Sequence, residues 1–458
     1  MGSLWKKVVT AVATIIAGAT NCASADALKW DSIADRVDAR IETWTVPDLL
    51  QNVAAATGWQ IFIDPRITNR IPARFTGKQP GDALRQLLGR YNYALVPETN
   101  GPAKLFVFRD SRDQATRAIQ PLQTAEKTKT VKSLIGNELV VTLKPGEKID
   151  DLAKKLGAKI VGRADGQNTY RLRFEDDQAA QTARSELQDD SAVDSVDNNY
   201  SVARPETPQA LGTPGVPLGL SPKAVPDGKY TIVGLVDSAV QPKEGNFSEF
   251  LLPGASGSDN ASRTDPSHGT SMAETILRAV AANSEDKSTT VRLLPVNVFG
   301  AGGEQTTTYD IAVGIYTAVN GGAMIVNLSL GGDGDSSFLH NTIKTAHDQG
   351  VVFIAAAGNE PVTTDTWPAA YPEVLAVTAS DRSGNLASYA NRGSFVDAIA
   401  PGGNVVTFNG QQYFVVGTST STAFASGIAA AISETTKGTG KPLEAAVLQA
   451  LGSKKSAP

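Results

Sequence analysis

Short apolar runs separated by helical patterns dominate the C-terminal half of this 458-residue chain. Six such runs, rich in β-branched residues, cover residues 232–236, 291–298, 323–330, 351–357, 374–377 and 395–399. Continuous apolar runs that alternate with helices are typical of a parallel sheet covered on both faces. In such a sheet, functional residues gather at the carboxyl ends of the strands.

Two smaller α+β modules are predicted before this domain. In residues 27–110, apolar runs predict strands over 41–46, 59–63, 93–96 and 105–108. Asp48 is expected to cap a helix that runs to Ala56, and Pro80 is expected to open a second helix with leucines along one face. The module contains no catalytic cluster.

Residues 131–204 show a second alternation of strands and helices. The pattern predicts strands over 138–143, 169–174 and 193–196, and helices over 150–156 and 177–187. A βαββαβ order is typical of a ferredoxin-like sandwich. The polar residues 111–130 suit a linker before this module. The Pro- and Gly-rich residues 205–228 suit an extended, exposed and easily cut segment after it.

The first 25 residues have the pattern of an export signal. Lys6 and Lys7 are followed by an apolar stretch, and the tripeptide ASA at 23–25 is a small-x-small cleavage site. Residues 1–25 are therefore a predicted secretory signal peptide, with Asp26 as the mature start. The apolar stretch is well short of the roughly 20 residues that span a bilayer, which disfavours a membrane anchor. We expect a secreted or periplasmic protein.

The amino-acid composition argues against several classes of function. The 42 Lys+Arg and 47 Asp+Glu residues leave a net charge of −5, so no nucleic-acid partner is predicted. The single cysteine, Cys22, lies in the signal segment, which excludes a disulfide framework and a cysteine-based zinc site. Any mechanism that needs an imidazole must use one of three histidines, His268, His340 or His347.

Four polar residues at strand ends and helix starts carry the predicted chemistry. Asp237 ends the first apolar run, and Asn359 closes another. His268 lies in DPSHGTSMAETI, where a helix begins, and Ser419 starts a helix of small residues. Ser419 is the predicted nucleophile, His268 the general base, and Asp237 the residue that orients the imidazole. The amide of Asn359 and the backbone N–H of Ser419 are predicted to bind the developing oxyanion.

The order of these motifs resembles that of the subtilisin-like serine proteases, the subtilases. The resemblance rests on DS after an apolar strand, HGT, AAAGN and GTS, and it extends to VNLSLGG, WPAAYPEVLAVTAS and FVDAIAPGG. It implies a subtilisin-like three-layer α/β domain with a parallel sheet over residues 229–458, and a serine endopeptidase that acts on polypeptides.

Two groups of residues are expected to bind substrate. The resemblance implies that an extended peptide pairs with the segment Ser329, Leu330 and Gly331. The pocket for the residue before the scissile bond would be lined by Ala356, Ala357 and Gly358. These small walls leave room for a large apolar side chain, and no acidic residue in the motifs favours Lys or Arg. We expect cleavage after apolar or aromatic residues.

Several positions beside the motifs depart from the family pattern. After the nucleophile these are Thr420, Ser421 and Ala423, and after the histidine they are Ser271 and Glu274. They keep a second hypothesis open, an envelope interaction protein whose protease domain is weak or inactive. Taken singly, each of the four chemical residues also has an ordinary role as a strand-end, turn or helix-cap residue.

The two small modules resemble accessory domains. The strand VTLKPG and the tail SAVDSVDNNYSVARP resemble inhibitor-type subtilase propeptides. This implies a zymogen whose residues 131–204 act as an intramolecular inhibitor, with self-cleavage between Tyr200 and Leu211. Residues 27–110, with DLLQNVAAATGWQIFIDPRI and PGDALRQLLGRYNYAL, resemble the short N-terminal domain of secretins and TonB-dependent receptors. This implies the Gram-negative periplasm and an envelope protein partner.

Few residues offer a metal site. Asp333 and Asp335 in GGDGDSS provide carboxylates for a structural calcium ion, which many subtilases need, the alternative being a plain acidic loop. His340 and His347 lie seven residues apart on a predicted helix, about 10.5 Å along its axis, too far to share a metal. They are expected on a solvated face. No other cofactor is predicted.

Overall fold

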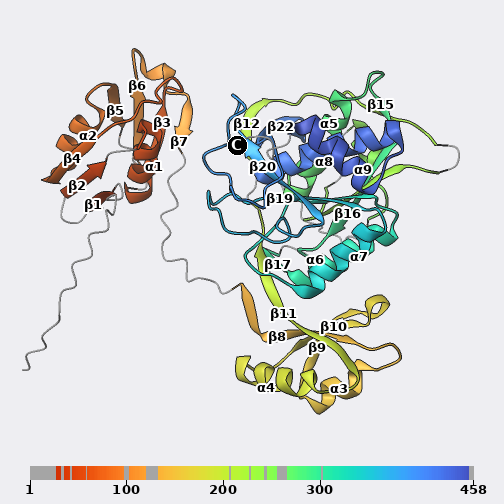
Figure 1. Cartoon of the computed structure of the whole chain (residues 1–458). Helices are drawn as coiled ribbons and strands as arrows, with labels where there is room; N and C mark the ends of the chain where they lie inside the picture. Colours follow the sequence, from red (N-terminus) through yellow and green to blue (C-terminus); the bar gives the residue numbers. More distant parts are fainter. Residues whose placement is uncertain are drawn as a thin grey trace, which may run out of the picture. The chain divides into compact units, whose positions relative to one another are not determined.

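The chain forms two compact units, Met1–Lys129 and Thr130–Pro458 (Figure 1). The computed structural model describes residues 27–31, 36–41, 44–57, 59–96, 103–119, 133–205, 208–225, 228–241, 245–254, 266–300 and 303–452. The predicted signal peptide, Asp26 and residues 120–132 lie outside these ranges. None of the helices in these ranges is both long and apolar enough to cross a membrane.

The first unit is built from two small sheets and two α-helices. One sheet has the order β1-β2-β4 and the other the order β5-β6-β3-β7. The strands are β1 (Ala27–Asp31), β2 (Arg36–Ile41), β3 (Gln60–Ile63), β4 (Ala73–Lys78), β5 (Asn92–Val96), β6 (Lys104–Phe108) and β7 (Arg117–Ile119). The helices are α1 (Val46–Thr57), α2 (Pro80–Leu88) and the 3-10 turn η1 (Arg112–Gln114). Leucines and isoleucines from both helices and both sheets form one buried core.

Two boundaries in this unit differ from the sequence prediction. The predicted strand 41–46 is wrong, because Ile41 ends β2 and Val46 begins α1. The start of α1 is fixed by a reciprocal pair in which the Asp48 carboxylate accepts from the Thr45 N–H and the Thr45 hydroxyl accepts from the Asp48 N–H. The linker predicted over 111–130 begins too early, because η1 lies in this range and β7 completes the second sheet.

Residues 134–203 form a small α+β module, called the prodomain below. Its elements are β8 (Leu134–Leu143), α3 (Ile149–Lys155), β9 (Lys159–Ala164), η2 (Asp165–Gln167), β10 (Thr169–Arg173), α4 (Asp177–Gln188) and β11 (Val193–Ala203). The sheet order β11-β8-β10-β9 and the βαββαβ sequence order give the ferredoxin-like arrangement that the pattern predicts. The last strand is longer than predicted.

Both faces of the prodomain sheet are buried. Leu139, Val141 and Leu143 of β8 pack toward α3 and α4. The alternate residue Val140 joins Tyr309 and Phe338 of the next domain in a second apolar cluster. Since side chains alternate along a strand, one strand can serve two cores. In Figure 1 the prodomain sheet lies against the α6 and α7 side of the larger domain, with its own helices on the far side.

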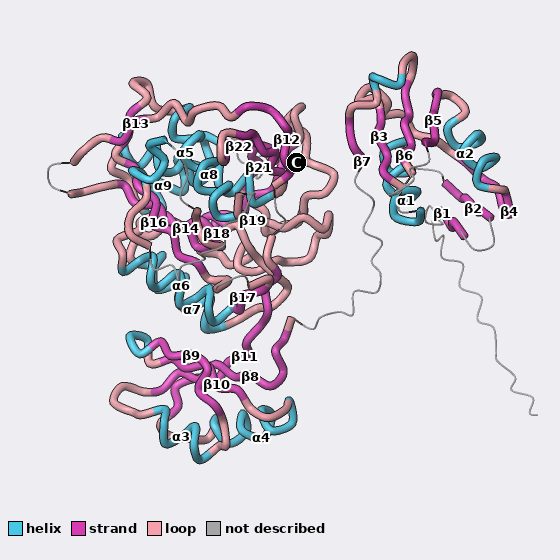
Figure 2. The backbone as a smooth tube through the Cα atoms, turned by 180° about the vertical axis from the view of Figure 1, so that it is seen from behind, coloured by secondary structure: helices cyan, strands magenta, loops and turns pink. Residues whose placement is uncertain are grey.

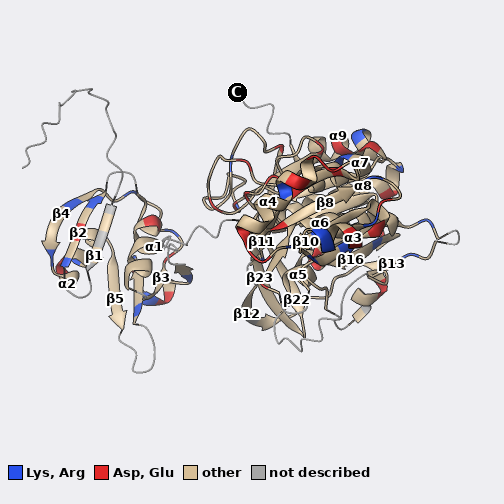
Figure 3. Ribbon diagram, turned by 90° about the horizontal axis from the view of Figure 1, so that it is seen from below, with Lys and Arg blue, Asp and Glu red and all other residues tan. Residues whose placement is uncertain are grey.

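The larger domain is organised around a six-stranded parallel sheet of order β16-β14-β18-β19-β20-β21. Its strands are β14 (Thr231–Asp237), β16 (Val291–Asn297), β18 (Ile325–Leu328), β19 (Val352–Ala356), β20 (Val374–Ser380) and β21 (Ala398–Pro401). The predicted parallel sheet is confirmed, and its last strand lies slightly later than the apolar run at 395–399. Most residues of these strands are buried. Figure 3 shows Lys, Arg, Asp and Glu on outer helices of the second unit, such as α4 and α9 (Gly440–Leu451).

Helices cover both faces of this sheet (Figure 2). On one face lie α5 (His268–Ala282), α8 (Thr418–Thr436) and α9 (Gly440–Leu451), and on the other lie α6 (Thr308–Asn320) and α7 (Ser337–Asp348). Val233 and Leu235 of β14 face the α5 and α8 side, whereas Val236 faces α6. This is the three-layer subtilisin-like arrangement that was predicted.

Short strands complete the domain. They are β12 (Gln209–Pro214), β13 (Ser221–Pro222), β15 (Ser288–Thr289), β17 (Gln305–Thr307), β22 (Gly403–Phe408) and β23 (Gln411–Val416), together with the 3-10 turn η3 (Gly245–Phe250). Strand β12 extends the hairpin β22–β23. The segment 205–228 was expected to be extended and exposed; its residues 209–214 form the extended strand β12, are largely exposed, and also pair with β23.

Candidate active site

Asp237 and His268 form a close buried pair. Asp237 is the last residue of β14, and His268 is the first residue of α5. The His268 Nδ1 lies 2.8 Å from Asp237 Oδ1 and 2.9 Å from Oδ2. Because Nδ1 faces two acceptor oxygens, it carries the ring proton and leaves Nε2 as the basic nitrogen.

The local sequence holds His268 at this place. Ser267 is the N-cap of α5, with its hydroxyl accepting from the Thr270 N–H. The Gly269 N–H donates to the Ser238 hydroxyl at 2.9 Å, and a Cβ at Gly269 would overlap the Ser238 carbonyl oxygen. The glycine of the HGT motif is thus required by close approach of two backbones.

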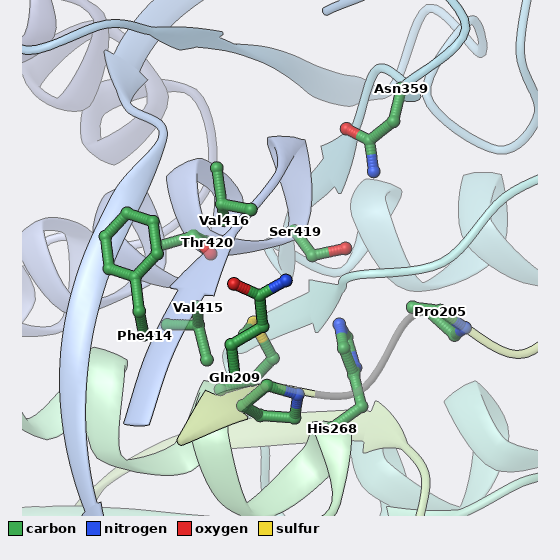
Figure 4. A pocket seen from close by; sticks show the side chains of 11 residues that line it. Pro205, Gln209, His268, Asn359, Phe414, Val415, Val416, Ser419 and Thr420 are labelled. Atoms are coloured by element: carbon green, nitrogen blue, oxygen red, sulfur yellow. The ribbon is translucent and has the colours of Figure 1, made fainter. Parts of the chain in front are cut away.

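Ser419 lies in the first turn of α8, two residues after the glycine that caps the helix. Gly417, the N-cap, has φ +143°, a conformation that favours glycine. The Ser419 hydroxyl donates to the Ser329 carbonyl at 3.1 Å, and the Ser329 hydroxyl donates back to the Ser419 carbonyl at 3.0 Å. The predicted nucleophile is therefore bonded to the predicted substrate strand and not to His268. The edge of the His268 ring points toward the Ser419 hydroxyl across the pocket (Figure 4).

Asn359 stands on the other side of Ser419. Its side-chain oxygen accepts from the N–H and the hydroxyl of Thr418, at 2.9 and 3.0 Å. This fixes the amide so that its nitrogen points toward the space beside Ser419 (Figure 4). Because Ser419 is in the first turn of α8, its backbone N–H has no acceptor within the helix. The two predicted oxyanion donors thus belong to residues that line the same cavity.

A cavity of about 60 Å³ joins these residues. Its lining includes His268, Ser419 and Asn359, so all three lie around one space. The chain's own Pro205, Pro208 and Gln209 also line it, together with Met272, Phe414, Val415, Val416 and Thr420. The segment that joins the prodomain to the larger domain thus runs past the predicted catalytic residues.

The prodomain tail pairs with the larger domain before it reaches this cavity. The end of β11 runs antiparallel to β17, with Ser201 opposite Thr307 and Ala203 opposite Gln305. The Arg204 N–H continues the ladder by donating to the Glu304 carbonyl at 2.8 Å. Sequence analysis missed β17, because its residues QTT carry no apolar pattern and the strand is defined by its pairing.

The other predicted substrate residues lie at the neighbouring strand ends. Ser329 and Leu330 are buried, and Gly331 is half-buried beside the Trp367 carbonyl. Ala356 and Ala357 are also buried at the end of β19. Gly358 follows with φ +108°, and a Cβ there would meet the Asn391 amide.

Glu274, one of the residues that depart from the family pattern, is held by contacts within the fold. Glu274 is buried in α5 and forms an ion pair with Arg278 at 2.6 Å. It also accepts from the Thr407 N–H, which ties α5 to β22. Arg278 donates in turn to the Val216 carbonyl at 2.9 Å, which anchors the chain just after β12.

The histidines outside the cavity and one aspartate of the predicted calcium loop form hydrogen bonds within the fold. His347 is largely buried, and its Nε2 lies 2.9 Å from Glu444, so its expected place on a solvated face is wrong. His340 lies 2.9 Å from Glu373 and stacks on Tyr371. The Tyr371 hydroxyl donates to Asp335, and burial raises the pKa of Tyr371 well above its usual range. Within the described ranges, no three His, Cys, Asp or Glu side chains are grouped to hold a metal ion.

Two family models match the chain. The model of the subtilase family matches residues 228–456, and that of the fervidolysin N-terminal prodomain matches residues 120–199. Thermitase from Thermoactinomyces vulgaris is 33% identical over 212 residues, which cover 45% of this chain and 75% of thermitase. A thermophilic serine proteinase from Bacillus sp. (strain AK1) is 40% identical over 141 residues, 30% of this chain but only 35% of that protein.

Two solved structures share the fold. Fervidolysin from Fervidobacterium pennivorans has a TM-score of 0.52 at 20% identity, over 65% of this chain and 55% of its own. The epidermin leader peptide processing protease EpiP from Staphylococcus aureus has a TM-score of 0.51 at 16% identity, over 70% of this chain and 95% of its own. The family match spans the whole domain that carries Asp237, His268, Asn359 and Ser419. The chain therefore belongs to the subtilase family.

Proposed function

We propose that this chain is an exported zymogen of a serine endopeptidase that cleaves its own chain between Tyr200 and Leu211. One observation supports the proposal: His268, which is paired with Asp237, lines one cavity with Ser419 and Asn359, and the chain's own Pro205 and Gln209 line it too. A peptide bound in this cavity would lie beside the proposed nucleophile, base and oxyanion donors.

Acyl transfer in this site would begin with a turn of the Ser419 hydroxyl away from the Ser329 carbonyl, toward His268 Nε2. His268 then takes the hydroxyl proton as the serine oxygen attacks the peptide carbonyl. Asp237 stabilises the imidazolium that forms, at 2.8 Å. His268 passes the proton to the leaving amine, and a water molecule activated by the same imidazole hydrolyses the acyl-enzyme.

The tetrahedral intermediate carries a negative oxygen that needs fixed donors. The Asn359 amide nitrogen and the Ser419 N–H would supply them, since Thr418 already holds the Asn359 oxygen on the opposite side. In subtilisin, loss of one such side-chain donor lowers the rate by about 10²–10³-fold. Asn359→Ala should have an effect of that size here.

The prodomain would inhibit the enzyme in place. Its tail fills the strand position beside β17 that an extended substrate would take, through the pairs of Ser201 and Ala203. Covalent attachment gives this tail a high effective concentration in the cleft. Activity therefore requires cleavage and removal of residues up to the processing site.

For external substrates we propose cleavage after apolar or aromatic residues. The small residues Ala356, Ala357 and Gly358 at the end of β19 support this preference, because they leave space and bring no negative charge. Comparable cleavage after Lys in a peptide library would contradict it. A structural calcium ion near Asp333 and Asp335, export by residues 1–25, and an envelope partner for residues 27–110 remain proposals of the same kind.

The bond between Ser419 and the Ser329 carbonyl favours a second candidate function, an envelope interaction protein with an inactive protease domain. The two candidate functions can be distinguished by expressing the parent chain and the Ser419→Ala variant side by side. For the enzyme, only the parent should process itself, react with a fluorophosphonate and cut casein. Loss of the subtilisin nucleophile costs about 10⁶-fold in kcat, so the variant should stay at full length.

N-terminal sequencing of the processed protein adds a positional check. A new terminus between Tyr200 and Leu211 is expected, and a start well outside that window would contradict self-cleavage in the observed cavity. If the parent and the variant are equally unprocessed and unlabelled, the interaction-protein candidate is correct.

A further inference from the structure

Residues 208–216, called the strap below, lead away from the catalytic cavity along the edge of a small sheet. Pro208 and Gln209 line the cavity that also holds Ser419 (Figure 4). From Gln209 to Pro214 the strap forms β12, which pairs antiparallel with β23. The sheet order is β12-β23-β22, so the strap covers the edge of β23 that faces away from β22.

The chain passes the cavity in the direction of a bound peptide. The prodomain tail pairs with β17 before the cavity, and β12 pairs with β23 after it. A substrate bound in the same direction would place the residues that follow its scissile bond, the primed residues, along β23. An extended peptide binds a sheet edge by pairing with it, and one edge accepts one strand. The strap and the primed residues of a substrate therefore compete for β23.

The C-terminal end of the strap is anchored to the helix that begins with His268. The Thr407 hydroxyl of β22 accepts from the Val216 N–H at 3.0 Å and donates to the Val216 carbonyl at 2.9 Å. Arg278 of α5 donates to the same carbonyl at 2.9 Å and is itself held by the buried Glu274. All of these residues follow the proposed cleavage window, so a cut in that window leaves the anchor joined to the larger domain.

The strap is held less firmly between the cavity and this anchor. Its register with β23 shifts between Ala210 and Pro214, and Leu211 is 45% exposed. The Thr213 hydroxyl donates to the Gln412 side chain in an exposed hydrogen bond. A segment that is tethered at one end and loosely paired elsewhere can leave its site and return. The tether keeps its effective concentration at that site about millimolar.

We propose that the strap stays on β23 after self-cleavage and acts as a second autoinhibitory element, which blocks the primed side of the active site. The prodomain covers the cleft before the scissile bond, and the strap covers it after that bond. Full activity on long polypeptides therefore requires displacement of the strap as well as removal of the prodomain. The proposal rests on the proposed endopeptidase function.

The experiment compares two substrates of the processed enzyme after the prodomain has been removed. One is an internally quenched peptide that extends well past the scissile bond on both sides. The other has the same residues before the bond and ends there in a p-nitroanilide, so it has no primed residues to pair with β23. The strap should lower kcat/KM for the long peptide and leave kcat/KM for the anilide nearly unchanged.

Thr407→Ala weakens the anchor without touching the cavity. It removes two neutral hydrogen bonds to Val216, each worth roughly a factor of five, so kcat/KM for the long peptide should rise about tenfold. The value for the anilide should stay within about twofold. Thr436→Ala, at an exposed threonine near the end of α8, is the matched control and should change neither value.

A second variant removes the strap and keeps the anchor residues. A recognition sequence for a site-specific protease, inserted at the exposed Gly219, allows the strap to be cut off after self-processing. The cut should raise kcat/KM for the long peptide at least as much as Thr407→Ala does, with the anilide again unchanged. This variant decides the question even if Thr407→Ala does not fold.

The outcomes separate this inference from the proposed function. If the processed chain neither reacts with fluorophosphonate nor cuts the anilide, the endopeptidase function is wrong, and the inference with it. If the anilide is cut but removal of the strap leaves the ratio of the two kcat/KM values unchanged, only the inference is overturned. It is also overturned if N-terminal sequencing shows that the active enzyme begins after Val216, because the strap would then be absent.

Discussion

The prodomain and the first unit are both small α+β modules, but they satisfy their polar groups in different ways. In the first unit, the buried Asp64 accepts from Arg66 of the same turn, so the ion pair is local. In the prodomain, polar side chains of β11 and β10 reach into the larger domain. The prodomain thus completes part of the larger domain.

The first turns of two helices in the larger domain, α6 and α7, are hydrogen-bonded by side chains of the prodomain. The Asp197 carboxylate of β11 accepts from the Ser336 hydroxyl and the Phe338 N–H, both at 2.8 Å, at the start of α7. The Asn199 side-chain oxygen accepts from the Thr308 hydroxyl and the Tyr309 N–H, both at 3.2 Å, at the start of α6. The prodomain thus provides part of the caps of the two helices on which it packs.

Charged groups extend the same interface. Arg171 of β10 donates to Asp310 of α6 at 2.8 Å. The buried Glu138 is held within the prodomain by Arg173 and by the Asn199 amide. Because Asn199 bonds Glu138 on one side and α6 on the other, the prodomain core and the interface are connected.

The largest expected effect is on the yield of active protease when each of the two modules is deleted in turn. Without residues 133–204, the first turns of α6 and α7 lose their partners and the apolar surface around Tyr309 is exposed. We expect the yield of active protease to fall by at least about 100-fold, because a partner that binds only the folded state stabilises it by mass action. Removal of residues 27–119 should change the yield by no more than about twofold. Fluorophosphonate labelling of the expressed protein measures both yields.

If both deletions lowered the yield of active protease equally, the expected difference between the prodomain and the first unit would be wrong. The same result would follow if the first unit, and not only the prodomain, supported folding of the larger domain. The amount of the full-length Ser419→Ala chain is measured beside the amounts of the two deletion variants. This comparison shows whether a difference in yield comes from a difference in export.

A smaller effect is expected from the two cap residues. Asp197→Ala and Asn199→Ala together should raise the dissociation constant of the prodomain from the processed protease by about 30-fold, at about 1 kcal/mol for each lost cap. Inhibition of the processed enzyme by separately produced residues 130–204 measures this constant. Asp194→Ala, at an exposed position of the same strand, is the control and should leave it nearly unchanged.

The smallest effect concerns acid stability of the first unit. The hydrogen bond from Arg66 lowers the pKa of Asp64 from 3.8 to about 2. A carboxyl with a lowered folded-state pKa stabilises the fold fully above about pH 4, and this contribution is lost as the pH falls toward 2. Asp64→Asn should therefore flatten the pH dependence of thermal unfolding of residues 27–119 over this range, followed by tryptophan fluorescence.

The matched control is Asp82→Asn, which breaks the exposed Asp82–Arg85 pair. Exposed pairs contribute little, so its unfolding curve should keep the parent's acid slope. An unchanged slope in Asp64→Asn would mean that the local ion pair does not stabilise the unit.

Much of the fold follows from local patterns. The apolar runs of the large domain predict its parallel sheet because strands buried on both faces must be apolar at every position. Leu84, Leu87 and Leu88 predict α2 because they share one helical face. The pattern failed at 41–46, where Ile41 and Val46 are both buried but belong to a strand and a helix that meet there.

The amino-acid sequence alone determined which side chains are available for chemistry: one serine in GTS, one histidine in HGT, and the aspartate and asparagine at strand ends. Tertiary structure decided everything that depends on contacts between distant segments. It placed β17 opposite the prodomain tail, bonded Ser419 to Ser329 and paired His347 with Glu444. Local propensity is set by neighbours in the chain, whereas strand pairing, hydroxyl orientation and burial of a polar group are set by distant residues, such as Phe338 for Asp197, 141 positions away.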